Sequence, residues 1–280
     1  MKSIVIIGIL VLITVSCQQS GRGDRLENEP KYHSTAKELQ DSIIAEVFRS
    51  EILKTEGIFS TEWQDELDKA LEIDSTIAYL WQQKAMPLFK QGKYELGMSF
   101  LDKAVKYDER EYLDYRAFMK CIFSKSYLDA IVDFEKAKKK YGDNYVMDHS
   151  YSFYIGLSKI QLNEFAEAEK LLEEEAEQQL KNQGEGWVHH LDLFYLGIAR
   201  YEQNKYEEAI KAFNRALEKY PKFSEVLYYK AICTGRLGDE DEAKRLMEEA
   251  KKYGKQGFTI NEDNSIYERY PYQIRWKLWD

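Results

Sequence analysis

The four histidines, His33, His149, His189 and His190, are the side chains most easily recruited for proton transfer or metal binding. His189 and His190 are adjacent in the sequence. Successive side chains on a helix project about 100° apart, so neighbouring imidazoles cannot hold one ion as an i, i+4 pair can. We therefore expect a structural or surface role for this pair rather than metal ligation.

The cysteines and carboxylates also lack the spacing of a reactive site. Cys121 and Cys233 lie far apart and form no C-x-x-C pair, so they indicate neither a zinc site nor a redox couple. Their apolar neighbours predict small buried side chains. The acidic run 173–175 is typical of a solvated helix face. The sequence thus predicts a protein that is not an enzyme and holds no metal and no cofactor.

Composition excludes one class of partner and favours one fold class. Lys and Arg total 40 against 49 Asp and Glu, and the net charge of −9 has the wrong sign for binding a phosphate backbone. Nucleic acid is therefore not expected as a partner. Only 4 prolines and 15 glycines interrupt the 280 residues, which include 21 Tyr and 13 Phe. These numbers favour a helical protein rich in aromatic residues.

The first residues have the pattern of an export signal. Lys2 precedes an apolar stretch from Ile4 to Val15, and the small residue Ser16 stands just before Cys17. The stretch is too short to span a bilayer, which takes a helix of ~20 residues. Residues 1–16 are therefore predicted to be a signal peptide.

The residues Thr14-Val15-Ser16-Cys17 resemble the lipobox of bacterial lipoproteins. The resemblance implies that Cys17 is acylated and anchors the mature chain in the bacterial cell envelope. Gln18 after the cysteine suggests the outer membrane. The polar residues 17–32 would then form a flexible tether. The alternative is an ordinary cleaved signal, in which case Cys17 carries no lipid.

The rest of the chain repeats a pattern of paired helices. One unit, residues 196–221, reads LGIARYEQNKYEEAIKAFNRALEKYP. It is similar to the tetratricopeptide repeat (TPR), a helix-turn-helix unit of ~34 residues. The small residue that begins the second helix recurs at spacings of 33, 38, 41 and 34 residues, at Gly97, Ala130, Ala168, Ala209 and Ala243. Longer loops would absorb the two long spacings at little entropic cost.

A sixth, degenerate unit precedes these five. Trp63 and Ala70 stand one ~34-residue period before their counterparts in the next unit, and the first helix is expected near residues 41–54. The resemblance implies an all-α TPR solenoid over residues 33–255, with about five to six repeats wound into a right-handed superhelix. Pro87 falls within a first helix and predicts a kink there.

The first helices of the repeats should line a concave groove. Tyrosine and arginine are enriched at binding hot spots, because they bury a large area and keep a polar group. Each inward-facing side chain could instead fill the core between repeats, and the sequence leaves both alternatives open. The predicted partner-binding residues are Tyr79, Gln82, Phe89, Tyr112, Tyr115, Met119, Phe153, Phe194, Tyr201, Tyr228 and Arg236.

The C-terminal residues 256–280 depart from the repeat and are rich in aromatic side chains, among them Tyr270 and Trp276. A terminal repeat exposes the face that a further neighbour would cover, so an aromatic capping segment is expected. The alternatives are self-association, or occupation of the groove in place of a partner peptide.

Together these patterns predict a lipid-anchored TPR adaptor that binds a protein or peptide partner in its groove, within the bacterial envelope and attached to the membrane through Cys17. One alternative is a structural envelope component that self-associates into a homo-oligomer. A less favoured one is an enzyme with a site between the tail and the groove. Such an enzyme would need a carboxylate or histidine pair converging in a desolvated pocket, and the sequence shows no obvious pair.

Overall fold

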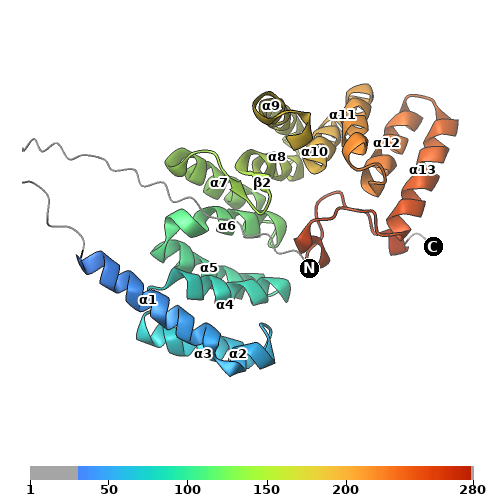
Figure 1. Cartoon of the computed structure of the whole chain (residues 1–280). Helices are drawn as coiled ribbons and strands as arrows, with labels where there is room; N and C mark the ends of the chain where they lie inside the picture. The colour runs from blue at the N-terminus through green and yellow to red at the C-terminus, as the bar shows by residue number, and fades with distance from the viewer. Residues whose placement is uncertain (1–30, 279–280) are drawn as a thin grey trace, which may run out of the picture.

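A computed structural model of the protein describes residues 31–278, apart from the side chains of residues 31–34 and 52–54. The predicted signal peptide, Cys17 and almost all of the predicted tether lie outside the described residues. Within the described part of the chain, helices stack one after another along an arc, with the C-terminal segment inside it (Figure 1). Among these helices none is long and apolar enough to cross a membrane.

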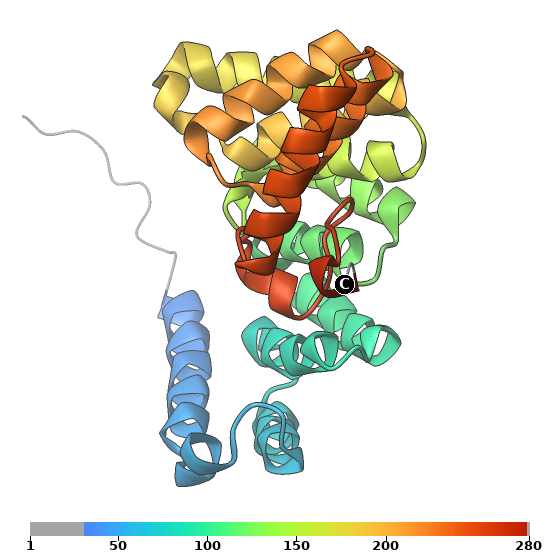
Figure 2. The ribbon, with the colours of Figure 1, turned by 90° about the vertical axis from the view of Figure 1, so that its right-hand side faces the viewer.

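The arc begins with a unit that departs from the other repeats. α1 (Lys31–Arg49) is followed directly by the short α2 (Glu51–Glu56), and α3 (Thr61–Ile73) completes the unit. Ser60 caps α3, because its hydroxyl accepts a hydrogen bond from the Trp63 amide at 3.1 Å. The unit has its own small core, in which Ile43 and Leu67 are buried. Figure 2 shows it at one end of the molecule.

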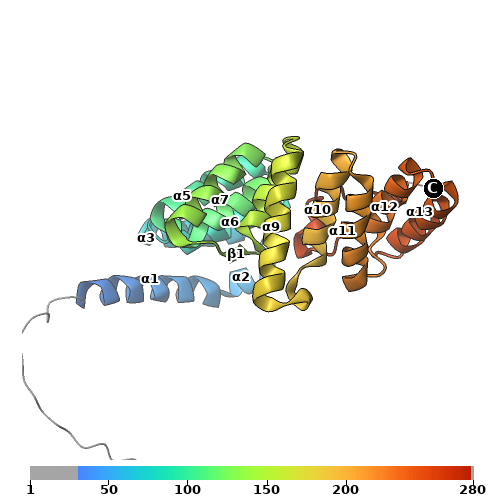
Figure 3. The ribbon, with the colours of Figure 1, turned by 90° about the horizontal axis from the view of Figure 1, so that it is seen from above.

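Five helix pairs follow in chain order, as the view from above shows (Figure 3). Their second helices begin around the small residues used to align the repeats, and Ala130, Ala168 and Ala209 are fully buried there. The pairs are α4 (Ala78–Lys90) with α5 (Tyr94–Tyr107), α6 (Glu109–Ile122) with α7 (Tyr127–Tyr141), α8 (Tyr151–Gln161) with α9 (Phe165–Gln183), α10 (His190–Glu202) with α11 (Tyr206–Lys219), and α12 (Ser224–Arg236) with α13 (Glu240–Lys255).

The two helices of a pair approach closely where one of them carries a small residue. A Cβ atom added at Gly197 of α10 would collide with the ring of Phe213 on α11, and one at Gly156 would collide with Leu172. Phe213 and Leu172 are fully buried. This interlocking of a small residue with a large one is the packing that the repeat pattern predicts, and the all-α TPR solenoid is confirmed.

The two long repeat spacings have separate structural causes. Between α7 and α8 the chain forms a hairpin of β1 (Tyr145–Val146) and β2 (His149–Ser150), paired antiparallel with Tyr145 opposite Ser150. Its turn residues Met147 and Asp148 both adopt positive φ, as a two-residue hairpin turn requires. In the next repeat α9 is extended to 19 residues, and the 3-10 helix η1 (Glu185–Trp187) follows it. The hairpin stands directly before the first helix α8, and η1 stands shortly before the first helix α10.

Pro87 lies inside α4, which is assigned as one continuous helix. Proline has no amide hydrogen, so the Gln83 carbonyl one turn earlier loses its helical partner. The indole Nε1 of Trp63 donates a hydrogen bond to this carbonyl over 3.3 Å. The carbonyl that Pro87 leaves without a helical partner is thus used for a hydrogen bond between the first unit and the second.

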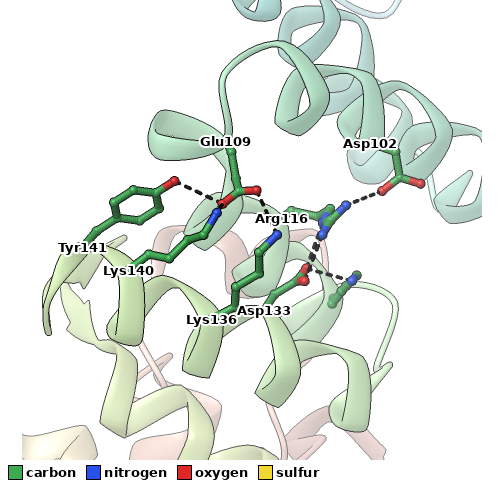
Figure 4. A network of polar contacts seen from close by, with 8 residues as sticks. Asp102, Glu109, Arg116, Asp133, Lys136, Lys140 and Tyr141 are labelled. Atoms are coloured by element: carbon green, nitrogen blue, oxygen red, sulfur yellow. Dashed lines mark hydrogen bonds and ion pairs between the residues drawn. The ribbon is translucent and has the colours of Figure 1, made fainter.

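On the outer side, ion pairs join α5, α6 and α7 (Figure 4). Arg116 of α6 donates two hydrogen bonds to Asp133 of α7, both 2.8 Å long, and a third of 2.8 Å to Asp102 of α5. Lys120 lies 2.7 Å from the same Asp133 carboxylate. Asp133 is buried, so these cations compensate its loss of hydration.

Candidate functional site

The structure buries some of the predicted partner-binding residues and leaves others partly exposed. Phe89, Met119, Phe153 and Phe194 are at most 2% exposed and belong to the core between repeats. They sit one or two helical turns from residues that do face outward, and sequence spacing alone does not separate the two orientations. At these four positions the core alternative holds, and the side chains have no free surface to offer a partner.

The C-terminal segment that follows α13, residues 256–278 and here called the tail, lies along the concave face (Figure 1). It contains the 3-10 helices η2 (Asp263–Ile266) and η3 (Trp276–Leu278). Tyr270 is only 1% exposed and forms part of the main core. Trp276 packs on Leu227 and Ala250 of the last helix pair. The tail therefore both occupies the groove and caps the terminal repeat, which are two of the three alternatives left open by the sequence.

Much of the contact to the tail is made to its main chain. The Tyr195 hydroxyl donates to the Pro271 carbonyl at 2.9 Å, and the Lys125 ammonium donates to the Arg269 carbonyl at 2.6 Å. In the opposite sense, the Ile274 amide donates to the Glu225 carboxylate at 3.2 Å. Main-chain hydrogen bonds of this kind hold an extended segment in place largely independently of its sequence.

Side chains of the tail add specific contacts at both ends of the face. Tyr94, the first residue of α5, donates its hydroxyl to Glu268, and the Tyr272 hydroxyl donates to Glu202 at 2.7 Å. Tyr228, one of the predicted groove residues, packs edge-on against Trp276 with ring centroids 5.9 Å apart. The tail thus covers the face from α12 to the turn before α5.

One carboxylate under the tail has an unusual pKa. Glu225, the second residue of α12, is 0% exposed. Burial raises its pKa to about 7, although hydrogen bonds from the Ser224 hydroxyl and the Ile274 amide favour the charged form. The tail thus contacts this carboxylate directly, through the main chain of Ile274.

The tail leaves the earlier part of the concave face open. A cavity of about 450 Å³ lies there between α4, α6 and the loop before α8. Three predicted groove residues, Gln82, Tyr112 and Tyr115, line it together with Tyr145 and Tyr151. Burial raises the pKa of Tyr112 well above the ordinary tyrosine value, so its hydroxyl stays protonated and can donate a hydrogen bond. We call this region the open half of the groove.

The remaining predicted groove residues lie at its margins. Tyr79 is 37% exposed on α4, close to Phe48 of the first unit. Tyr201 is half-buried against Tyr206 and Tyr229. Arg236 is exposed at the last residue of α12. Their part in partner binding stays a prediction.

The structure also assembles a polar cluster that the sequence analysis did not foresee. His149 lies 3.3 Å from Asp192 through Nδ1 and 3.4 Å from Glu262 of the tail through Nε2. The ring of His189 meets His149 edge-on, with centroids 4.8 Å apart. His149 and Asp192 are buried at 2% exposure each. This is a convergence of histidines and carboxylates at the junction of tail and groove.

The charges in this cluster are shifted by burial and by one another. Burial alone would lower the pKa of His149, but its hydrogen bonds to Asp192 and Glu262 outweigh burial and raise the pKa to about 9. Burial, reinforced by the charges of His149 and His190, lowers the pKa of His189 to about 4. His149 is thus the charged imidazole at neutral pH, and His189 is neutral.

Sequence reasoning compared His189 with its neighbour His190, whereas the relevant partner is one repeat away. His149 stands two residues before α8 and His189 stands directly before α10, so both occupy the start of a first helix. Their separation of 40 residues, close to the repeat spacings, was the available signal. The acidic run was also interpreted too simply, because Glu175 is buried at 7% exposure while Glu174 is exposed. Cys121 and Cys233 are buried, as predicted.

Comparison with known proteins supports the repeat assignment. Residues 78–111 and 190–223 match the tetratricopeptide repeat family, and these segments span α4 with α5 and α10 with α11. No curated protein matches the chain in sequence.

Two solved structures illustrate the similarity in fold. PilW, described as a widely conserved type IV pilus biogenesis factor, has a TM-score of 0.59 at 12% identity, over 76% of this chain and 93% of its own. MamA from Desulfovibrio magneticus RS-1 has a TM-score of 0.53 at 16% identity, over 64% of this chain and 96% of its own. At such identities the likeness concerns the fold.

Proposed function

We propose that this protein is a non-catalytic TPR adaptor, whose open half of the groove binds an extended segment of a partner protein. The observation that carries the proposal is the tail itself. It is a segment of turns and short 3-10 helices, and it is held on the concave face by hydroxyl, ammonium and carboxylate groups directed at its main chain. The concave face therefore has the chemistry needed to bind an extended chain, and the tail leaves part of that face free.

The open half offers similar groups to an incoming segment. The rings of Tyr112, Tyr115 and Tyr145 supply apolar area and hydroxyl groups at the cavity of about 450 Å³. Burial raises the pKa of Tyr115 as well, so its hydroxyl also remains protonated at neutral pH. Hydroxyl donors beside aromatic rings suit a segment with free main-chain carbonyls.

The test is site-specific photocrosslinking in cells. A benzophenone amino acid replaces Tyr115 in the open half, and in the matched control it replaces Tyr107, an exposed tyrosine at the end of α5 that does not line the cavity. We expect a discrete protein adduct from position 115 and none from position 107. Equal adducts at both positions, or none at position 115, would contradict binding in the open half.

We further propose that the chain acts in the bacterial envelope, attached by lipid on Cys17. The lipobox-like residues 14–17 and the preceding apolar stretch support this proposal. Cys17→Ser removes the sulfur that would form the thioether, so this variant should lose labelling by a fatty-acid analogue and leave the membrane fraction. Unchanged labelling or membrane retention would refute the anchor and leave the groove proposal standing.

A further inference from the structure

His149, His189 and Asp192 form a cluster whose potential ligand atoms, one from each residue, all lie within 4.8 Å of one another. We propose that these three side chains bind a divalent transition-metal ion. Two imidazoles and one carboxylate are a ligand set typical of Zn²⁺ and its neighbours in the first transition row. The inference goes beyond the adaptor function, because none of these three side chains lines the open half, although Tyr145 of the hairpin lines the cavities at both places.

The charge around the cluster is suited to a cation. Asp192, Glu175 and Glu262 bring three carboxylates to this region, and Asp192 and Glu175 are less than a tenth exposed. A divalent cation would balance this negative charge in surroundings of low dielectric constant.

The hydrogen bonding of Gln179 also supports a bound cation. Its amide nitrogen donates to Glu175 at 3.0 Å and to Asp192 at 3.1 Å, and this fixes the orientation of the amide. The amide oxygen is then left buried without a hydrogen-bond donor. Gln179 is only 7% exposed and belongs to the lining of the same cavity. A buried acceptor of this kind needs a donor or a cation.

An ion can reach the cluster from solvent. A cavity of about 550 Å³ opens above it, lined by His149, His189, Asp192 and Gln179 and by apolar atoms of Met147 and Trp187. The hairpin before α8 and the η1 segment before α10 form its rim, so the cavity exists because two successive repeats carry additions. Its size leaves room for water molecules to complete the coordination shell.

Binding requires small adjustments of the ligands. Bond lengths of about 2.0–2.2 Å place the donor atoms of a tetrahedral zinc site roughly 3.3 Å apart, so donor atoms that now lie within 4.8 Å of one another must approach by up to about 1.5 Å. His149 must give up its proton, and His189 must give up the hydrogen bond that its Nδ1 accepts from the Leu191 amide at 3.3 Å. Glu262, 3.4 Å from His149, is the carboxylate nearest at hand for a fourth ligand from the tail.

The experiment titrates the full chain, in mild detergent, with Zn²⁺ alone and follows binding by calorimetry. His189→Ser removes one ligand and keeps an N-cap side chain for α10, so the variant should stay folded. His190→Ala is the matched control, because His190 is the adjacent histidine and lies outside the cluster. Far-UV circular dichroism checks that each variant retains its helices.

We expect one equivalent of Zn²⁺ to bind to the parent chain and to raise its melting temperature. His189→Ser should weaken binding at least tenfold, Asp192→Asn should do the same, and His190→Ala should change it less than threefold. The proposal is overturned if the parent chain binds no Zn²⁺, if His189→Ser binds as the parent does, or if His190→Ala weakens binding as much. None of these results bears on partner capture at Tyr115, so the two proposals fail separately.

Discussion

The two halves of the concave face use the same kind of residue in opposite ways. In the half nearer the C-terminus, aromatic side chains such as Tyr195 and Tyr229 contact the tail of the same chain. In the open half, Tyr112 and Tyr115 line a cavity that the tail does not enter. Whether an aromatic residue on a solenoid's inner helix is a core residue or a surface residue thus depends on which segment covers it. The residue type alone does not determine this.

The comparison is tested most strongly by truncating one side chain from each group. Phe194→Ala removes a fully buried ring that packs against Phe223 and Tyr229, and it should lower the free energy of unfolding by about 3–5 kcal/mol. Tyr115→Ala, in the open half, should cost about 1 kcal/mol. Urea denaturation of both variants measures the difference. Equal losses would mean that the open half is packed as tightly as the core.

A second test detaches the tail. Tyr270→Ala opens a hole in the main core where the tail is anchored, and we expect a loss of about 3 kcal/mol together with fast trypsin cleavage after Arg269. In the native structure the Arg269 carbonyl is held by Lys125. Tyr267→Ala serves as the control, because Tyr267 is 40% exposed. Slow cleavage of the Tyr270 variant would show that the tail stays docked without its anchor.

The pH dependence of stability should reveal Glu225. The unfolded chain ionises this residue with a pKa near 4.5, whereas the folded pKa is about 7, so the native state holds the proton more tightly. The free energy of unfolding should therefore fall by on the order of 3 kcal/mol as pH rises from 4.5 to 7. Glu225→Gln should remove this part of the pH profile. A parent profile that rises over the same interval, with no change in the variant, would contradict the assignment.

The smallest expected effect concerns the outer ion pairs near the open half. Asp133→Ala leaves Arg116 and Lys120 without their shared, buried partner; because both cations keep some contact with solvent, it should cost about 2 kcal/mol, as is typical of losing hydrogen bonds to a charged group. Asp129→Ala on the same helix is exposed and should be neutral within about 0.5 kcal/mol. Thermal melts compare the two. A neutral Asp133 variant would mean that these repeats are held by apolar packing alone.

The repeat fold was predictable from sequence because its signal is strictly local and periodic. Gly97, Ala130 and Ala209 mark positions where only a small side chain fits, and every repeat needs one. The division of the groove was less predictable. Phe89 and Tyr79 lie on the same helix at inward positions, yet one is buried and the other is exposed. The difference depends on which neighbour covers each position, and helical spacing does not encode that.

The path of the tail and the histidine cluster were not predicted from sequence, for a related reason. Residues 256–280 have no helical period. Their sequence therefore indicates the aromatic content of the tail but does not predict the path of the tail along the concave face. His149 and His189 are brought together by the stacking of neighbouring repeats and by two added segments, which are properties of the assembled solenoid. Both histidines stand just before a first helix. An alignment of the repeats with one another would have shown this and could have predicted that the two side chains lie close together.

The hydrogen bond from Tyr94 to Glu268 joins residues 174 positions apart in the chain. In an ordinary solenoid each unit contacts its neighbours only, and folding can begin anywhere and spread. Here the tail returns to the second unit, and contacts of such long sequence separation raise the contact order. Because this contact joins the second unit to the segment after the last repeat, we expect the repeats between them to unfold as one event rather than from the ends.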